Sequence, residues 1–483
     1  MRSLSRNRLG AEGAAALAPA FAANSALTRV DIRRNNIAGD GAAQLAAAVL
    51  GNLKIEMFNE IPIKEMRANS LTELDLTGKG VGVEGGMVVA GLIPVSGGLT
   101  SINLSGNLLC GVYTYFGELR GTYTTVGIAA IAEALRINGG LTALDLSNNY
   151  FINYLKDEDV SAICEAIQSN KDTKLASLNF EGNRISPVGA NAVAAMVAFT
   201  GSLAVTNLLG NKLDSKSALM LAEVGKQKGI SLCGMQRDQT TADLHYKHLM
   251  PPDVILLASD LSQAVVTGEL TALDLSSNDL KDEDVSAICE AIRSNKETKL
   301  ASLNFKCNGI GPVGAIAVAA MVAVTSSLTS LNLSENALCG RTYVGGTYTA
   351  EGITAIADAL RGNGGLTSID LSRNQLCGIS DDWTCQQGTY TTEGITAIAD
   401  ALRVNGVLTK LSLAWNKLEE QGTKAICEAL EQNRTLRELD LSGRNNIGGE
   451  AGAKHVADML GVHVPELMVS GLAMAGAGAR DGA

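Results

Sequence analysis

Leucine returns along most of this chain in one fixed pattern of apolar and polar positions, Leu-x-x-Leu-x-Leu-x-x-Asn, at a spacing of about 28 residues. The pattern reads LTSINLSGN from Leu99, LTALDLSNN from Leu141, LTSLNLSEN from Leu328 and LTSIDLSRN from Leu366. Apolar and polar residues alternate inside each segment, which predicts a short strand with one buried face. An apolar stretch with helical spacing follows each asparagine, so strands and helices are predicted to alternate along the chain.

The repeat that begins at Leu300 shows how one copy should fold. Leu300, Leu303 and Phe305 fall on the predicted buried face of its strand. Asn308 follows at a slot where a buried amide can bond loop backbone groups that no strand partner satisfies. Pro312 stands near the start of the helix, where a missing N–H costs little. Successive strands must then be parallel, and right-handed crossovers are strongly preferred.

A period of this length is typical of a leucine-rich repeat solenoid, in which neighbouring repeats stack into one continuous core. We therefore predict an α/β fold, a right-handed solenoid (horseshoe) of about 14 repeats, with a parallel inner sheet and outer helices. The LTxLDLSxNxL segment and the EGxxAIAxAL-type helix, as in Leu366–Leu376 and Glu393–Leu402, resemble the ribonuclease-inhibitor-like subfamily of these repeats. That subfamily includes ribonuclease inhibitor, the repeat regions of NOD-like receptors and the Ran GTPase-activating protein. The resemblance extends from Leu4 to about Leu460 and implies the horseshoe fold, whereas its members serve many functions.

The pattern is broken in two places. The interval Leu27–Leu71 spans 71 − 27 = 44 residues and leaves no room for a full helix, so an irregular repeat is expected near 53–70. The interval Leu203–Leu270 spans 270 − 203 = 67 residues, too many for two regular repeats. Within it, TTADLHYK is predicted as a strand and Pro251–Leu261 as its helix, with an irregular stretch at 229–240.

A long block is nearly duplicated. KDEDVSAICEAIQSN from Lys156 matches KDEDVSAICEAIRSN from Lys281, at an offset of 281 − 156 = 125 residues. The Asp-Glu-Asp of each block has the form of paired catalytic carboxylates, but it directly precedes a helix and favours N-capping and first-turn roles. We expect a first repeat array at 1–228, an irregular repeat or junction at 229–250, a second array at 251–465 and a low-complexity tail at 466–483.

The N-terminal segment allows two interpretations. Arg2, Arg6 and Arg8 followed by alanines have features of a targeting signal. Asn7 and Asn35, however, stand 35 − 7 = 28 residues apart, which is one period, and an alanine-rich helix fits between them. We therefore predict a repeat, and a chain that begins inside a repeat is consistent either with a fragment of a longer protein or with a degenerate first repeat.

The composition of the chain limits the kinds of partner and the cellular compartment that can be expected. The net charge of −11 argues against a nucleic-acid ligand, which would favour a Lys/Arg stripe. No run approaches 18 apolar residues, so no membrane-spanning helix is predicted. Six of the nine cysteines recur in two repeat slots, as buried packing residues would, which favours a reducing cytoplasmic compartment. These six are Cys164, Cys289 and Cys427 in one slot and Cys110, Cys339 and Cys377 in the other.

Few residues could carry chemistry. Gly80 follows Lys79 where a phosphate-binding loop would need a hydroxyl for magnesium. His245 and His248 stand in an irregular segment without a second ligand pair nearby, which favours exposed or loop-packing histidines over zinc. No nucleophile elbow or clustered Cys/His set supports a nucleophilic mechanism. We predict that the chain is not an enzyme and that it holds no cofactor and no metal.

The first candidate binding surface is the inner face of the sheet. The outward residue at the centre of each strand is mostly Asp or Asn, and among these we select Asp145, Asp274 and Asp370. Two interpretations stay open for this stripe. It is either a protein-binding surface or the default residue of the repeat, which stabilises neighbouring loops.

The second candidate surface is formed by long insertions after the asparagine in three repeats, at 110–122, 339–347 and 377–389. Each insertion occupies the same point of its repeat, so all three are expected on one rim of the solenoid. They concentrate aromatic residues in a chain with only 4% aromatics, and loops often carry function. We predict protein contacts at Tyr113, Tyr115, Phe116, Tyr343 and Trp383. The tyrosines of the GTYT segments are instead expected to pack on neighbouring repeats: Tyr123, Tyr348 and Tyr390.

The leading hypothesis for function is a non-enzymatic scaffold that binds a protein partner through the concave surface and rim loops. A solenoid offers a large curved surface, and a specific interface needs roughly 1,200–2,000 Å². The alternative is a regulator of an enzyme, either a GTPase activator or an inhibitor, with candidate arginines at Arg29, Arg33 and Arg34. A structural paralogue without a retained partner is a third possibility. The partner's identity and the oligomeric state are not determined by the sequence.

Overall fold

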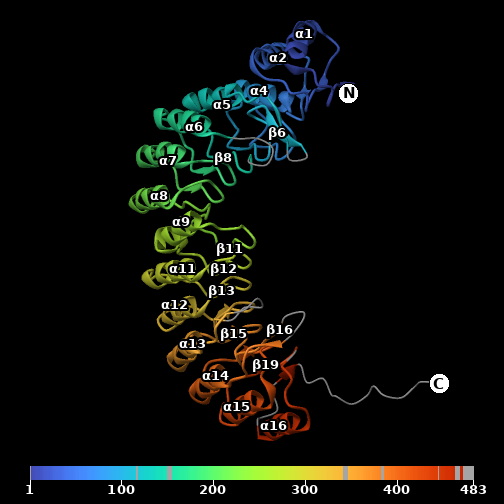
Figure 1. Ribbon diagram of the computed structural model, residues 1–483. Coiled ribbons are helices and arrows are strands. Elements are labelled where there is room, and N and C mark those ends of the chain that lie inside the picture. The colour runs from blue at the N-terminus through green and yellow to red at the C-terminus, as the bar shows by residue number, and fades with distance from the viewer. Residues whose placement is uncertain are drawn as a thin grey trace, which may run out of the picture. The chain divides into compact units, whose positions relative to one another are not determined.

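The computed structural model describes residues 2–115, 118–149, 155–340, 346–381, 386–443, 445–462 and 468–470. Only the backbone is described at residues 2, 113–115, 119, 380–381, 386–387, 462 and 468–470. The chain forms two compact units. The first contains Met1–Gln236 and Met250–Asp260, and the second contains Arg237–Leu249 and Leu261–Ala483. Within each unit, the parallel strands line one side and the helices line the other (Figure 1).

The first unit holds two parallel sheets. One has three strands, β1 (Arg2–Ser3), β2 (Arg29–Asp31) and β3 (Met57–Phe58). The other has five, namely β4 (Glu73–Asp75), β5 (Ser101–Asn103), β8 (Ala143–Asp145), β9 (Ser177–Asn179) and β10 (Val205–Asn207). The helices are α1 (Gly10–Ala23), α2 (Gly39–Gly51), α3 (Ile63–Arg67), α4 (Val83–Leu92), the 3₁₀ helix η1 (Ile93–Val95), α5 (Val126–Ile137), α6 (Asp157–Ser169), α7 (Pro187–Phe199), α8 (Ser215–Lys228) and most of α9 (Pro251–Leu261).

The second unit holds one parallel sheet of eight described strands. They are β11 (Thr241–Asp243), β12 (Ala272–Asp274), β13 (Ser302–Asn304), β14 (Ser330–Asn332), β15 (Ser368–Asp370), β18 (Lys410–Ser412), β19 (Glu438–Asp440) and β20 (Met468–Ser470). The helices are α10 (Ala264–Thr267), α11 (Asp282–Ser294), α12 (Pro312–Val322), α13 (Glu351–Gly362), α14 (Glu393–Val404), α15 (Glu419–Leu430) and α16 (Gly449–Val462).

The predicted fold of a single repeat is confirmed. Leu300, Leu303 and Phe305 are buried, and Pro312 is the first residue of α12. Strands β13 and β14 pair in parallel with Leu303 opposite Leu331, so the leucines of successive repeats fall in register. The α/β solenoid of parallel strands and helices predicted from the period is therefore present in both units.

Buried asparagines after the strands connect successive repeats. Asn336 donates from Nδ2 to the carbonyl of Leu333 in its own repeat and to that of Phe305 in the preceding one, both at 3.0 Å. Its Oδ1 accepts the backbone N–H groups of Asn308 and Ile310 at 3.2 Å. These bonds satisfy loop groups that no strand partner reaches, as the sequence predicted.

A second row of asparagines, which the sequence analysis missed, stands at the helix ends. Asn405 Nδ2 donates to the carbonyl of Leu360 in the preceding helix at 2.6 Å, and its Oδ1 accepts the Leu408 N–H at 2.8 Å. Carbonyls in the last turn of a helix have no partner within that helix, so this side chain caps its neighbour. Equivalent Nδ2 bonds to preceding helices are made by Asn52, Asn170, Asn295, Asn363 and Asn433.

The irregular repeat near 53–70 is confirmed, since it contains only the five-residue helix α3. Arg67 at the end of α3 donates to the Leu50 carbonyl at 2.7 Å and so caps α2, where a regular repeat would use an asparagine. This repeat also buries Glu84 of α4, whose Oε1 accepts the Asn59 amide at 3.0 Å. Burial raises the pKa of Glu84 to about 7.

The predicted strand and helix of the second break are β11 and α9. Before them, Gly229 ends α8 in the left-handed conformation, and Ser231 bridges to Val205 at the edge of the five-stranded sheet. Asp260 of α9 accepts the Ser231 hydroxyl at 2.7 Å and the Leu232 N–H at 2.9 Å. This buried carboxylate thus anchors the irregular segment, and burial raises its pKa to about 6.

The structure also answers three smaller predictions, on the N-terminal segment, the Asp-Glu-Asp clusters and the cysteines. The N-terminal segment folds as a repeat, because β1 pairs with β2 and the Asn7 N–H donates to Asn35 Oδ1 at 2.7 Å. The Asp-Glu-Asp clusters occupy the first turns of α6 and α11, but the N-cap residue is the preceding lysine in each case, so the capping assignment was shifted by one residue. Of the eight cysteines described, only Cys307 is exposed, and none of the eight forms a disulfide.

Candidate functional site

The Asp/Asn stripe on the strand faces closes the turn after each strand. Asp145 accepts the Ser147 N–H at 2.8 Å, and Asp274 accepts the Ser276 N–H at 2.8 Å. Asp370 accepts the N–H group two residues later at 2.9 Å. The same bond recurs at Asp31, Asp75, Asn103, Asn179, Asn207, Asp243, Asn304, Asn332 and Asp440. The loop-stabilising interpretation is therefore confirmed, while protein binding by the three selected aspartates stays a prediction.

A hollow lies over the five-stranded sheet of the first unit. Its volume is about 310 Å³. The polar groups on it are connected from strand to strand, because Asn179 Nδ2 donates to Asp145 Oδ2 at 3.0 Å and Asn207 donates to Glu181 at 2.9 Å. These side chains are therefore held in place before any partner arrives. The polar residues that line the hollow are Ser101, Asn103, Asp145, Ser177, Asn179, Asn207 and Gln236.

Two of the rim insertions contain hairpins that the sequence analysis did not predict. Strands β6 (Val112–Tyr115) and β7 (Glu118–Gly121) pair antiparallel in the first insertion, and β16 (Ser380–Asp381) and β17 (Gln386–Gln387) do so in the third. Tyr113 and Tyr115 belong to β6, and only their backbone is described. The other three predicted contact residues lie outside the described residues: Phe116, Tyr343 and Trp383.

The GTYT tyrosines pack on neighbouring repeats, as predicted. The Tyr390 hydroxyl donates to the Leu418 carbonyl at 2.7 Å and accepts the Gly422 N–H at the start of α15. Tyr348 makes the equivalent pair of bonds one repeat earlier. Tyr123 differs, since its hydroxyl donates to the buried carboxylate of Asp159 at 2.7 Å. These tyrosines therefore fasten the bases of the insertions.

The second unit carries a column of side chains that the sequence analysis missed, here named the left-handed column. The residue before the asparagine slot has φ between +53° and +59° in six successive repeats, at Tyr246, Ser277, Cys307, Glu335, Arg373 and Trp415. This conformation costs a non-glycine residue roughly 1–2 kcal/mol. The five-stranded sheet of the first unit has glycine in four of its five equivalent slots, at Gly78, Gly106, Gly182 and Gly210. An alignment of the repeats on the asparagine would have revealed the contrast.

Arg373 and Trp415 stack within this column. The Arg373 N–H donates to the Ala414 carbonyl at 2.9 Å, so the two residues stand on adjacent repeats. The guanidinium carbon lies 4.5 Å from the indole centroid, and Trp415 is 40% exposed. A Cβ added at Gly443 would collide with the indole, which shows that the ring lies against that backbone. Among the described residues, the Arg373 guanidinium has no hydrogen-bond or ion-pair partner.

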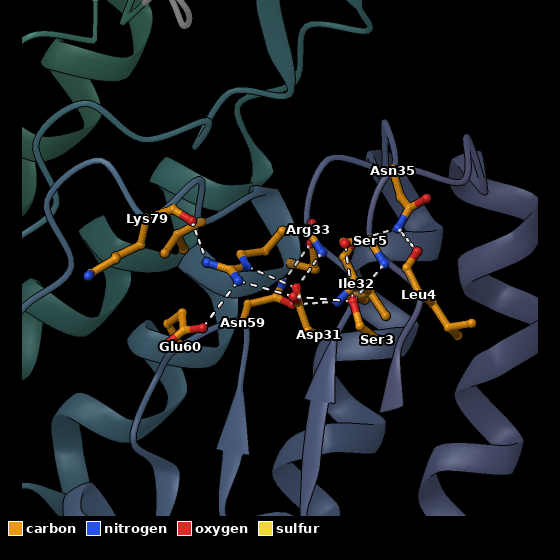
Figure 2. A network of polar contacts seen from close by, with 12 residues as sticks. Ser3, Leu4, Ser5, Asp31, Ile32, Arg33, Asn35, Asn59, Glu60 and Lys79 are labelled. Carbon is orange, nitrogen blue, oxygen red and sulfur yellow. Dashed lines mark hydrogen bonds and ion pairs between the residues drawn. The ribbon is translucent and has the colours of Figure 1, made fainter. Parts of the chain in front are cut away.

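Arg33, one of the three candidate arginines, is bound within its own unit (Figure 2). Its Nε lies 2.9 Å from Asp31 Oδ1, and its Nη2 lies 3.1 Å from Glu60 Oε1. Its Nη1 donates to the Lys79 carbonyl at 2.9 Å. The Arg33 guanidinium holds the pKa of Asp31 below its usual value. An arginine that enters a partner's active site must extend outward, so the activator hypothesis rests on Arg29 and Arg34.

The parallel strands, outer helices and repeated asparagines make this chain a leucine-rich repeat protein. The Leucine Rich repeat family model matches residues 3–18, 23–46, 270–289, 296–319 and 432–454. The chain is 28% identical over 189 residues to NACHT, LRR and PYD domains-containing protein 5 of Bos taurus, a match that covers 38% of this chain and 16% of the relative. The ribonuclease-inhibitor-like subfamily stays a resemblance.

Two of the solved structures to which the chain is similar have low TM-scores. An internalin of Listeria monocytogenes has a TM-score of 0.32 and 15% identity, with 85% of this chain and 82% of the internalin covered. A chain of the Rad7 and Elc1 complex in yeast has a TM-score of 0.31 and 13% identity, with 81% of this chain and 78% of that chain covered. The fold assignment therefore rests on the strands and helices of this chain itself. Within the described residues, no helix is long and apolar enough to cross a membrane.

Proposed function

We propose that this chain is a non-enzymatic scaffold that binds a protein partner through its strand faces and rim hairpins. Leucine-rich repeat proteins commonly act in protein–protein interaction. The observation that carries the proposal is the hollow over β5, β8, β9 and β10, where Asp145, Asn179 and Asn207 are fixed by bonds between neighbouring repeats. Side chains that are ordered in advance lose little conformational entropy when a partner binds, which favours specific affinity.

Two further features support a binding role in a reducing compartment such as the cytoplasm. The rim hairpins extend from the repeats as added loop segments, and such loops often carry function. The buried cysteines of the described residues form no disulfide, as expected where disulfides do not persist. The partner proposed is a protein, neither a nucleic acid nor a membrane, because the net charge of −11 opposes anionic surfaces.

The test is quantitative capture of proteins from a native extract by the immobilised chain. The blocking variant Ser101→Arg/Ser177→Arg fills the hollow with two long side chains without removing a turn-closing residue. The matched control is Gln168→Arg, on the exposed face of α6. We expect a reproducible set of proteins with the wild type and the control, and a loss of at least tenfold with the blocking variant. A wild type that repeatedly captures no specific protein would refute the proposal.

A further inference from the structure

We propose that Arg373 and Trp415 form a docking platform for an acidic segment of a protein partner. A carboxylate of that segment would bind the edge of the guanidinium, and an apolar or aromatic side chain beside it would cover the indole. This inference rests on the proposed scaffold function and gives it a specific surface in the second unit and a partner chemistry.

The geometry of the stacked pair favours a carboxylate. The Arg373 guanidinium carbon lies over the indole ring, and the N–H groups of a guanidinium match the two oxygens of a carboxylate. Arg373 has no ion-pair or hydrogen-bond partner among the described residues, although it is held in position by the Trp415 ring at 4.5 Å. It differs in this from Arg33, whose guanidinium is neutralised within its own unit.

The charges around the platform leave the guanidinium available. Glu335, its neighbour in the left-handed column, pairs with Lys306 at 3.3 Å. The carboxylate of Asp370 accepts the Ser372 N–H in its own turn, at 2.9 Å. An acidic segment therefore meets, at Arg373, a cation that no carboxylate of the described residues neutralises.

Trp415 places a large aromatic side chain in a slot of the repeat whose backbone conformation favours glycine. Its φ of +59° is a conformation that glycine adopts without strain, and the next repeat has Gly443 at φ +77° in the corresponding turn. The indole lies against the Gly443 backbone and the Arg373 guanidinium, and Trp415 is still 40% exposed. Trp and Arg dominate the energetics of protein interfaces, which favours this exposed pair as an anchor for a partner.

The first test uses defined probes and the full-length chain. A fluorescein-labelled twelve-residue peptide that repeats Glu-Tyr-Gly is compared by fluorescence anisotropy with the same peptide carrying Gln for Glu. We expect the wild type to bind the Glu peptide at least tenfold more tightly. Arg373→Gln should abolish this preference, and Arg373→Lys should lose most of it because an ammonium cannot both stack and bind bidentately. The control Arg361→Gln, on the exposed face of α13, should retain it.

Trp415→Gly separates binding from folding. Glycine relieves the left-handed conformation, so the thermal midpoint of this variant should not fall, whereas its affinity for the Glu peptide should drop at least tenfold. Equal binding of the two peptides by the wild type would overturn the proposal. A preference that survives Arg373→Gln or Trp415→Gly would overturn it as well.

The capture experiment distinguishes this inference from the scaffold function. If the wild type captures no specific protein, the scaffold function itself fails. If it captures proteins that Trp415→Gly and Arg373→Gln retain in full, the scaffold function stands and the platform is refuted. Loss of captured proteins with both variants, but not with Arg361→Gln, would support the platform.

Discussion

Replacing Glu84 with Gln should remove a large part of the pH dependence of folding in the first unit. Glu84 is buried behind the irregular repeat, and its carboxylate accepts a hydrogen bond from the Asn59 amide at 3.0 Å. Burial raises its pKa from 4.5 to about 7. The protonated carboxyl is therefore the form that the folded state favours, and Gln resembles that form at every pH.

The direction and size of this pH dependence follow from the linkage between proton binding at Glu84 and folding. A raised folded-state pKa contributes stability that is complete below pH 4.5 and is lost as the pH rises through about 7. The shift of 7 − 4.5 = 2.5 units corresponds to about 3.4 kcal/mol at most. Between pH 5 and pH 8.5, the wild type should lose about 2.5 kcal/mol through this group. Glu84→Gln should not lose this contribution and should be the more stable protein at pH 8.5.

The assay is urea unfolding followed by circular dichroism at pH 5, 7 and 8.5. Asp260, whose pKa is raised to about 6, titrates in the wild type and in Glu84→Gln, so the difference between the two proteins isolates Glu84. The matched control is Glu351→Gln, in the exposed first turn of α13, which should follow the wild type at all three pH values. The reasoning is refuted if the wild type and Glu84→Gln show the same change in unfolding free energy between pH 5 and 8.5.

Three further predictions concern a helix-end slot, a tyrosine that bonds the next repeat and the third rim insertion. Thr200 occupies a helix-end slot that other repeats give to asparagine, and its hydroxyl is buried without a partner. Thr200→Asn should stabilise the chain by about 0.5–1.5 kcal/mol in urea unfolding, and a destabilised variant would contradict the capping role. Tyr390→Phe should cost about 1–3 kcal/mol in the same assay, because it leaves a carbonyl and an N–H without their partner. Shortening the 377–389 insertion to the regular repeat length should leave the thermal midpoint nearly unchanged and weaken capture of the partner. Loss of folding would show that the insertion is structural.

The repeated sequence pattern was sufficient to predict the strand, the turn and the helix of a single repeat. Alternation along Leu300–Phe305 placed the strand, Asn308 marked its end and Pro312 marked the start of the helix. These features are local, because side-chain direction in a strand and the missing N–H of proline depend on residues close in the chain. The packing role of Tyr390 was also predictable, since its GTYT segment recurs at the same point of three repeats. Contacts by the rim aromatics stay predictions.

Other features depend on contacts between repeats that are distant in sequence. Asn405 caps a helix 45 residues away, and the burial of Glu84 depends on an irregular repeat that supplies Asn59. Arg33 looked like a free cation until the fold placed Glu60 and the Lys79 carbonyl beside it. The sequence by itself thus determined the repeat, its strand, its turn and its helix. Only the tertiary structure decided which polar groups meet across repeats, because stacking sets those distances and the repeat pattern alone does not encode them.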